Sequence, residues 1–287
     1  MNTSKKIEKL IMEAVPSLPP NQKKVAEFFL ENMSLVALLP VKDIAKEAGV
    51  SQASIVRFAQ LLGFSGFKEL KDKISSSLKN QLSPTELYQY AASEKEKSPD
   101  TLKLVARNVI NNINDTIDSN GADVFSAVVD KIIAARQIIC LGLELSYHFS
   151  TLMTFQLRLY NYDARTLSLD FLRYQEQIAF MHPDDLLIAF SFSPYSRETV
   201  EAVAFAKSKG IDCIAFTDKK TAPIREFATH SIQIKTDNIM FSNSLGAIVV
   251  VINAIIAELN FRDKERTLNA LKIIEENIKD TRYFINQ

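Results

Sequence analysis

Residues 41–60, VKDIAKEAGVSQASIVRFAQ, decide how the first part of this chain folds. Ala45 is small where two helices must approach each other closely, and Gly49 falls where the turn between them needs a left-handed backbone. Ser51 is a favourable N-cap residue for the second helix. The apolar residues expected to form the shared core of the two helices are Ile44, Val50, Ile55 and Phe58. The spacing therefore predicts a helix-turn-helix.

The second helix of this motif is the expected recognition helix for double-stranded DNA. The residues expected on its first turns, facing the major groove, are Ser51, Gln52, Ala53, Ser54 and Arg57. Gln52 can pair with adenine, and Arg57 can pair with guanine or a phosphate. The lysines expected to contact phosphates, which position a protein without reading sequence, are Lys42, Lys68 and Lys71. A plain helical hairpin with solvated polar residues is the alternative.

The bulk composition is that of a folded protein large enough for two domains. The chain has 287 residues, of which 47% are hydrophobic and 24% charged, and this excludes an intrinsically disordered chain. The formal net charge is zero, but residues 1–80 carry 12 Lys and Arg against 8 Asp and Glu. This modest local excess of positive charge is compatible with nucleic-acid binding at the N-terminal end.

The remainder of the chain predicts a separate α/β domain. Residues 1–78 are expected to form the helix-turn-helix domain, polar residues 79–99 a linker, and residues 100–287 the second domain. Helical spacing of apolar residues predicts helices at 100–117, 123–135 and 262–285. Short apolar runs that alternate with helix-length segments lie at 137–141, 164–167, 186–190, 212–216 and 231–235. Alternation of this kind predicts a parallel sheet in a three-layer α/β/α, flavodoxin-like arrangement.

Neither the cysteines nor the apolar runs indicate a metal site, a disulfide or a membrane span. Cys140 and Cys213 lie inside apolar strand-like runs and are expected to be reduced core residues. The longest apolar run, residues 246–257, contains Asn253 and is too short to cross a bilayer. We therefore expect a cytoplasmic protein with no cofactor, no bound metal and no membrane partner.

A cluster of hydroxyl side chains marks the expected ligand site of the α/β domain. Ser191, Ser193 and Ser196 follow the predicted strand 186–190, at the edge of a parallel sheet where ligands usually bind. We expect Ser193 to cap the next helix and Pro194 to be its first residue. The start of that helix offers free N–H groups and a positive dipole end, which favour a compact anion such as phosphate. Serines that merely cap helices are the alternative.

Two sequence motifs resemble those of a known family. Residues 50–58, VSQASIVRF, followed by residues 62–70, LGFSGFKEL, resemble the RpiR-type (ribose phosphate isomerase repressor) regulators. The resemblance extends over almost the whole chain. It implies an N-terminal helical DNA-binding domain joined to a sugar isomerase (SIS) domain that senses a phosphorylated sugar.

The same resemblance implies which residues hold the ligand. Ser191, Ser193 and Ser196 match the serines of the family's phosphate loop, and Gly142 and Ser146 match its Gly-x-Gly-x-Ser segment after the first strand. Two positions depart from these patterns. Pro194 removes a backbone donor where the family has glycine, and Glu144 places a negative charge where the family has a second glycine.

These observations predict a DNA-binding transcription regulator, not an enzyme. A homodimer or homotetramer is expected to read a palindromic operator, and a phosphorylated small molecule is expected to change its DNA affinity. Two alternatives remain: a sugar-phosphate isomerase, or a regulator whose second domain only dimerises or binds an unphosphorylated metabolite. An isomerase needs an acid and a base, for which Glu144, His148 and Glu176 are the candidates.

Overall fold

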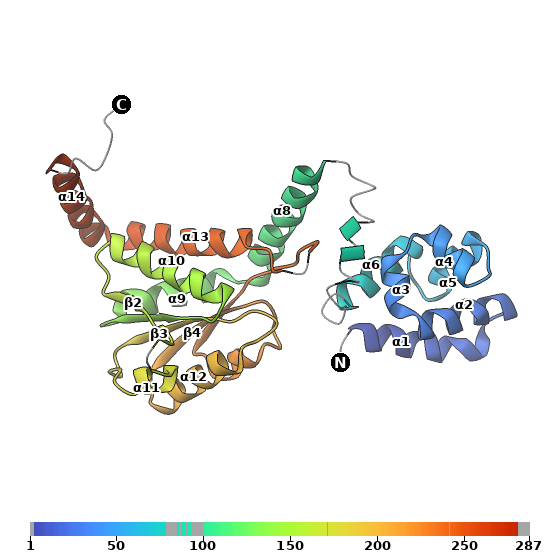
Figure 1. The fold of residues 1–287 in the computed structure, drawn as a ribbon, viewed down its shortest axis with the longest axis horizontal. Coiled ribbons are helices and arrows are strands. Elements are labelled where there is room, and N and C mark those ends of the chain that lie inside the picture. The colour runs from blue at the N-terminus through green and yellow to red at the C-terminus, as the bar shows by residue number, and fades with distance from the viewer. Residues whose placement is uncertain are drawn as a thin grey trace. The chain divides into compact units, whose positions relative to one another are not determined.

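The computed structural model of the chain describes residues 3–78, 85, 88–89, 91–92, 100–170, 172–240 and 242–280. Two compact units are present, one formed by Met1–Ala106 with Asn238–Ser242 and the other by Arg107–Asp237 with Asn243–Gln287 (Figure 1). The predicted linker at 79–99 lies almost entirely outside the described residues. No helix in these ranges combines the length and hydropathy that a membrane span needs.

The N-terminal unit is helical. Its elements are α1 (Thr3–Ala14), η1 (Val15–Ser17), α2 (Pro20–Glu31), α3 (Met33–Leu38), α4 (Val41–Glu47), α5 (Gln52–Leu61) and α6 (Phe67–Leu78). Phe29 lies at the centre of their core, with its ring edge-on to those of Phe58 and Phe67 at centroid distances of 5.1 and 6.4 Å. Burying large aromatic side chains of this kind is a main source of stability in a small domain.

The predicted helix-turn-helix is α4 and α5 with the turn between them. Gly49 has φ 61°, the left-handed conformation expected of it, and Ala45 is buried between the helices. The hydroxyl of Ser51 accepts a hydrogen bond from the Ser54 N–H at 3.2 Å, so Ser51 is the N-cap of α5 as predicted. The local sequence was enough to predict this motif, because Gly49 and Ser51 each satisfy a requirement of the neighbouring backbone.

The C-terminal unit is built on a parallel sheet of five strands. These are β1 (Ile138–Leu141), β2 (Ala164–Thr166), β3 (Leu186–Phe190), β4 (Asp212–Thr217) and β5 (His230–Gln233), in the order β2-β1-β3-β4-β5. The helices are α8 (Thr101–Ser119), α9 (Ala122–Ala134), α10 (Leu145–Leu159), α11 (Tyr174–Ile178), α12 (Arg197–Ser208), η2 (Pro223–Glu226), α13 (Gly246–Arg262) and α14 (Lys264–Asp280). The strand order is that of flavodoxin-like folds and confirms the predicted three-layer class.

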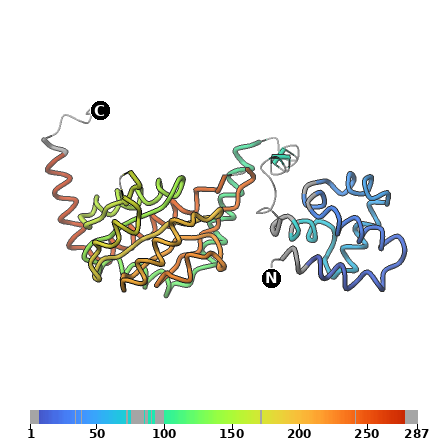
Figure 2. The backbone as a smooth tube through the Cα atoms, turned by 60° about the horizontal axis from the view of Figure 1, so that its bottom comes forward, coloured from blue at the N-terminus to red at the C-terminus, as the bar shows by residue number. Residues whose placement is uncertain are grey.

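Helices cover both faces of this sheet, and each face has its own core (Figures 1 and 2). Helices α9, α10 and α13 pack on one face, whereas α11, α12 and η2 pack on the other. Cys140 belongs to the first core and Cys213 to the second, so the two thiols point to opposite sides of the sheet. Burial raises the pKa of each thiol to about 12, which keeps both protonated. The cysteines are reduced core residues, as predicted.

Helix α8 and the residue that follows it border the end of β5 and the segment after it, in a way that the apolar residues of α8 did not predict. The residues that do so stand at every fourth position and are Asn108, Asn112 and Thr116 of α8, with Asn120 directly after it. Asn120 exchanges two hydrogen bonds with the backbone of Gln233, at 2.9 and 2.7 Å, and Thr116 accepts from the Lys235 N–H at 2.9 Å. Asn108 and Asn112 both donate to the carbonyl of Asp237 at 2.6 Å.

The spacing explains this match between a helix and an extended segment. Four residues of helix rise about 6 Å, and two residues of extended chain rise about 6.6 Å, so polar side chains at every fourth position meet alternate backbone groups. The apolar residues of α8 predicted the helix correctly but not its buried face, since Asn112 and Thr116 are buried and Ile117 is exposed.

The predicted C-terminal helix at 262–285 begins later in the structure, because Arg262 belongs to the preceding helix. Helix α13 ends at Arg262, and α14 begins at Lys264 after Asp263, whose carboxylate bonds the N–H and guanidinium of Arg266. Residues 281–285 lie outside the described residues. Leu268 and Leu271 of the predicted apolar stripe are exposed on α14.

Candidate functional site

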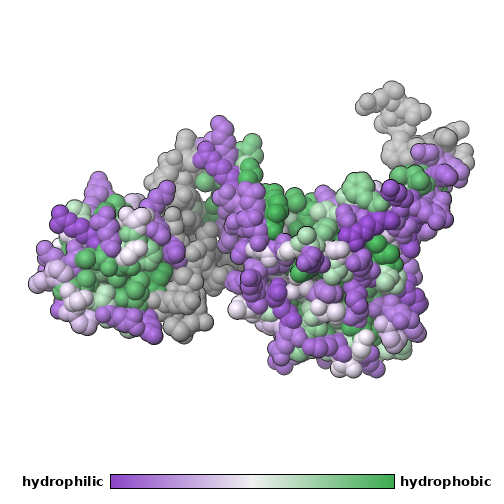
Figure 3. All heavy atoms as spheres, turned by 180° about the vertical axis from the view of Figure 1, so that it is seen from behind, coloured by the Kyte–Doolittle hydropathy of each residue, from purple (hydrophilic) through white to green (hydrophobic). Residues whose placement is uncertain are grey.

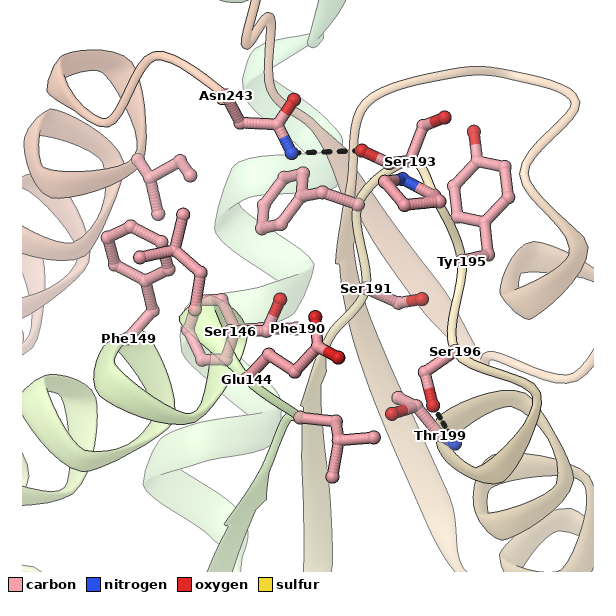
Figure 4. A pocket seen from close by; sticks show the side chains of 15 residues that line it. Glu144, Ser146, Phe149, Phe190, Ser191, Ser193, Tyr195, Ser196, Thr199 and Asn243 are labelled. Carbon is pink, nitrogen blue, oxygen red and sulfur yellow. Dashed lines mark hydrogen bonds between the residues drawn. The ribbon is translucent and has the colours of Figure 1, made fainter. Parts of the chain in front are cut away.

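A pocket of about 340 Å³ opens at the carboxyl edge of the parallel sheet, between the loops that follow β1 and β3 (Figure 4). Apolar side chains, including Phe149, Phe192 and Ile248, form part of its wall. The polar residues that line it are Glu144, Ser146, Ser191, Ser193, Tyr195, Ser196, Thr199 and Asn243. The pocket thus brings together all three serines predicted after β3 and the one predicted after β1.

Gly142 shapes the loop after β1 and does not itself line the pocket. A Cβ atom on Gly142 would lie 2.5 Å from the carbonyl oxygen of Ser146, so the loop can close this tightly only over a glycine. The Tyr174 hydroxyl donates to the carbonyl of Gly142 at 2.8 Å. Burial raises the pKa of Tyr174 to about 12, so this hydroxyl remains a donor near neutral pH.

Glu144 occupies the turn between β1 and α10 in a backbone conformation that favours glycine. Its φ is 53° and its ψ is −122°. Side-chain-bearing residues rarely adopt such angles, which cost on the order of 1–3 kcal/mol. The turn therefore has a backbone conformation typical of glycine while it places a carboxylate in the pocket wall.

Two hydroxyls after β3 are buried without a hydrogen-bond partner among the described residues. Ser191 is 3% exposed and Thr199 is 1% exposed, and neither side-chain oxygen is bonded. Buried polar groups in folded proteins are nearly always hydrogen-bonded, because an unmet one costs about 1–3 kcal/mol. Both residues line the pocket, so their hydroxyls are candidates for contact with a molecule bound there.

The predicted start of the helix after β3 was wrong by three residues. Helix α12 begins at Arg197, and its N-cap is Ser196, whose hydroxyl accepts from the Thr199 N–H at 3.3 Å. Ser193 is therefore not the cap, and Pro194 is not the first helical residue. The Tyr195 hydroxyl donates to Asp218 at 2.7 Å, which holds residues 193–195 in a turn towards β4. This long-range bond overrides the local preference for proline at a helix start.

Asn243 and Thr199 line the pocket but were missed by sequence reasoning. The Asn243 amide donates to the carbonyl of Ser193 at 3.0 Å, from a segment 50 positions further along the chain (Figure 4). No local motif signals such a contact. Thr199 could have been found, because it stands three residues after a serine that can cap a helix.

The three candidates for acid–base chemistry do not meet in this site. Glu144 lines the pocket, whereas His148 is exposed on α10 and is not among the lining residues. Glu176 accepts the Arg173 N–H at 2.9 Å at the start of α11. The described residues therefore place one candidate carboxylate in the pocket without a second acid or base from this set.

The predicted DNA-contacting residues lie on the surface around α5. Gln52, Ala53 and Arg57 are exposed on that helix, and Lys42 and Lys68 are exposed on α4 and α6. The Lys71 ammonium donates to the carbonyl of Leu39 at 2.7 Å, so it also ties α6 to the end of α3. Whether these side chains contact DNA stays a prediction.

The start of α2 adds residues to this surface that the sequence did not indicate. A shallow hollow beside α5 is lined by Pro19, Asn21, Gln22, Ser54, Arg57, Gln60 and Leu61. Asn21 and Gln60 are both exposed and carry amides that can bond phosphates or bases. Asn21 has no local signal because α2 reaches α5 only through the tertiary fold, whereas Gln60 lies on α5 itself.

Family models match the two units separately. A model described as a helix-turn-helix domain of the rpiR family matches residues 5–81, and a SIS domain model matches residues 131–258. The chain is 26% identical over 277 residues to an uncharacterized HTH-type transcriptional regulator of Haemophilus influenzae, covering 92% of this chain and 94% of that protein. It is 24% identical over 282 residues to the HTH-type transcriptional regulator HexR of Pseudomonas aeruginosa, covering 96% and 97%.

Solved structures agree with the fold. The sugar isomerase domain of an RpiR transcription factor from Sphaerobacter thermophilus is 27% identical, with a TM-score of 0.58 over 60% of this chain and 97% of that chain. The NanR protein of Vibrio vulnificus has a TM-score of 0.60 over 95% of this chain and 99% of that chain, and its 17% identity supports the fold alone. With an rpiR-type helix-turn-helix before a SIS domain, the chain belongs to the RpiR family of transcriptional regulators.

Proposed function

We propose that this regulator changes its affinity for an operator when a sugar phosphate occupies the pocket of the C-terminal unit. The observation that carries the proposal is the pair of buried, unpartnered hydroxyls of Ser191 and Thr199 in the pocket wall. The NanR protein of similar fold has been solved in complex with ManNAc-6P, which supports the same class of ligand here.

The phosphate is expected at the start of α12. The first N–H groups of this helix and its positive dipole end favour an anion, and Ser191 and Ser196 add hydroxyls beside them. Pro194 lacks an N–H group, so the loop offers one backbone donor fewer than a glycine would. The apolar wall at Phe149, Phe192 and Ile248 suits the carbon face of a sugar ring.

Replacing Ser191 with alanine should weaken binding of a sugar phosphate by about ten- to a hundred-fold, because a hydrogen bond to a charged group contributes about 1.5–3 kcal/mol. Calorimetry of the full-length protein with glucose 6-phosphate, fructose 6-phosphate and their unphosphorylated sugars would measure this. Ser208→Ala, at the far end of α12, is the matched control and should leave binding unchanged. If the unphosphorylated sugars bind as tightly as the phosphates, the ligand class is wrong. Turnover of either phosphate in a coupled assay would support an isomerase instead.

A route from the pocket to α8 supports coupling between ligand and DNA binding. Asn243, which bonds the Ser193 carbonyl, also accepts a hydrogen bond from Thr236, and the Ser244 N–H donates to the Thr236 carbonyl. The next residue, Asp237, receives the amides of Asn108 and Asn112 on α8. A ligand that contacts Asn243 is therefore linked through Thr236 and Asp237 to α8, the first helix after the predicted linker. Coupling of this kind is reciprocal between the two ligands.

We propose that two or four copies associate through the C-terminal unit. Large apolar side chains are exposed on its helices, with Phe155 of α10 60%, Phe261 of α13 70% and Leu268 of α14 58% exposed. Figure 3 shows apolar side chains at the surface over α13. A second copy of this chain would cover such surfaces and would also pair two helix-turn-helix motifs for a palindromic operator.

A fragment of residues 1–80 should therefore be folded, mostly monomeric and weak in DNA binding. The helical unit has its own core, whereas the exposed apolar surfaces named above lie downstream. Light scattering and circular dichroism on the fragment would test this, with the full chain as the reference. A dimeric fragment at micromolar concentration would contradict the assignment of association to the C-terminal unit.

A further inference from the structure

Glu144 stands out among the residues of the pocket because its backbone position disfavours it. Among the described residues, only Glu144 and Asn161 combine a side chain with a positive φ. Asparagine tolerates that region well, but glutamate does not. A glycine at 144 would fit the turn without strain. The glutamate is therefore present despite a cost in backbone strain, and the fold of the turn gives no reason for it.

Glu144 is solvent-exposed and supplies the one charged side chain of the pocket lining. None of the fifteen lining residues, all of which belong to the described part of the chain, is a lysine, arginine or histidine, and Glu144 is the one acidic residue among them. Its carboxylate has no hydrogen-bond or ion-pair partner among the described residues. Figure 4 shows this side chain extending between Ser146 and the serines of the β3–α12 loop. A ligand that carried only negative charge would meet repulsion here with no side-chain cation to offset it.

The two loops that form the pocket, one after β1 and one after β3, therefore prefer opposite charges. The start of α12, with Ser191, Ser196 and the buried Thr199 hydroxyl, suits an anion, whereas the Glu144 carboxylate suits a cation or a strong hydrogen-bond donor. At about 340 Å³ the pocket lies at the small end of the range for ligand sites and is of the size of a phosphorylated monosaccharide.

We infer that the ligand is an amino sugar phosphate with a free, protonated amine, and that Glu144 selects it over neutral and acetylated sugar phosphates. The ammonium group would pair with the Glu144 carboxylate while the phosphate lies at the start of α12. The inference rests on the proposed function, because it assumes a sugar phosphate in this pocket. It adds to that function the residue that determines specificity, Glu144, and the group on the sugar that this residue recognises, a protonated amine.

Calorimetry of the full-length protein with four compounds would test the assignment. Glucosamine 6-phosphate should bind at least about ten-fold more tightly than glucose 6-phosphate or N-acetylglucosamine 6-phosphate, as expected when one charge-assisted hydrogen bond is gained. Unphosphorylated glucosamine should bind weakly. In Glu144→Gln, which keeps the shape and removes the charge, the three phosphates should bind within about three-fold of one another, because only the amine loses its ionic partner.

Glu198→Gln is the matched control, because it removes the same charge from the first turn of α12 without changing a lining residue. It should leave the preference for the amine intact. Glu144→Gly relieves the backbone and should also abolish the preference, so a folding defect in Glu144→Gln does not spoil the test. Equal binding of the three phosphates by the wild-type protein, or a preference that survives in both Glu144 variants, overturns the role of Glu144 but leaves the sugar phosphate proposal standing. Binding of unphosphorylated glucosamine as tightly as of its phosphate overturns the proposed function itself.

Discussion

Replacing Arg57 with alanine is expected to lower the affinity of the full-length protein for its specific DNA site by at least about 30-fold. Arg57 is exposed on α5, and its guanidinium forms no hydrogen bond within the described part of the chain. An arginine paired with a guanine contributes about 1–3 kcal/mol of discrimination. A two-fold symmetric complex loses this contribution twice. Because the Arg57 side chain has no structural partner among the described residues, the fold and the binding of sugar phosphates should survive.

The measurement is fluorescence anisotropy at several salt concentrations, on a duplex selected from random DNA by the wild-type protein. Lys42→Ala is the control that separates base reading from phosphate contact. It should weaken binding to the selected and to unrelated duplexes alike, and it should reduce the salt slope by about one for each phosphate that is no longer neutralised. If Arg57→Ala binds the selected duplex as tightly as the wild type, the face of α5 assigned to DNA is wrong.

Replacing Gly142 with alanine is expected to remove sugar phosphate binding and to destabilise the C-terminal unit. The added Cβ would lie 2.5 Å from the carbonyl oxygen and 2.6 Å from the carbonyl carbon of Ser146. Both are backbone atoms, so the loop itself must shift. Forcing an atom into a packed region costs about 1–3 kcal/mol. Glu144 lies in this loop and Ser146 lies in the first turn of α10, which follows it, so a shift that breaks even one charge-assisted bond lowers affinity about ten-fold or more.

Thermal unfolding followed by circular dichroism, and calorimetry with glucosamine 6-phosphate, would measure the two effects of Gly142→Ala. Gly121→Ala is the matched control in the same unit, because nothing lies within 4 Å of the added Cβ and its φ is −72°. It should change the free energy of unfolding by less than about 1 kcal/mol and leave binding unchanged. A Gly142→Ala protein with wild-type stability and affinity would show that the loop can relax around the clash.

The parts of this structure that follow from local patterns were predictable from the sequence. The turn at Gly49, the cap at Ser51 and the five strands each rest on a few neighbouring residues. The approach of Ser146 to Ser191 was also predictable, because both follow strands of one parallel sheet and such strands end at the same edge.

The features that sequence reasoning missed depend on contacts between distant segments. Asn243 reaches the pocket from the segment before α13, and no neighbouring residue in the sequence indicates this contact. The start of α12 was misplaced because the bond between Tyr195 and Asp218 holds the preceding turn. The sequence showed that Glu144 places a negative charge where the family has glycine, but the glycine-like conformation of its backbone appears only in three dimensions.

Helix α8 was misread for a related reason. Its apolar residues have helical spacing, and helical spacing usually marks the buried face. The face that meets the end of β5 and residues 235–237 is instead polar, because these residues present backbone groups that need donors and acceptors. A pattern of asparagine and threonine every fourth residue is the signal that could have revealed it.

This polar face of α8 has a consequence for solubility. A free edge strand is a template on which other chains can add strands, and proteins protect such edges to avoid aggregation. The amide of Asn120 and the hydroxyl of Thr116 occupy the backbone groups of Gln233 and Lys235 that an added strand would use. Substitutions at these two positions would therefore appear in a cell as insoluble protein, even though neither residue lines the ligand pocket or lies on the DNA-facing helix.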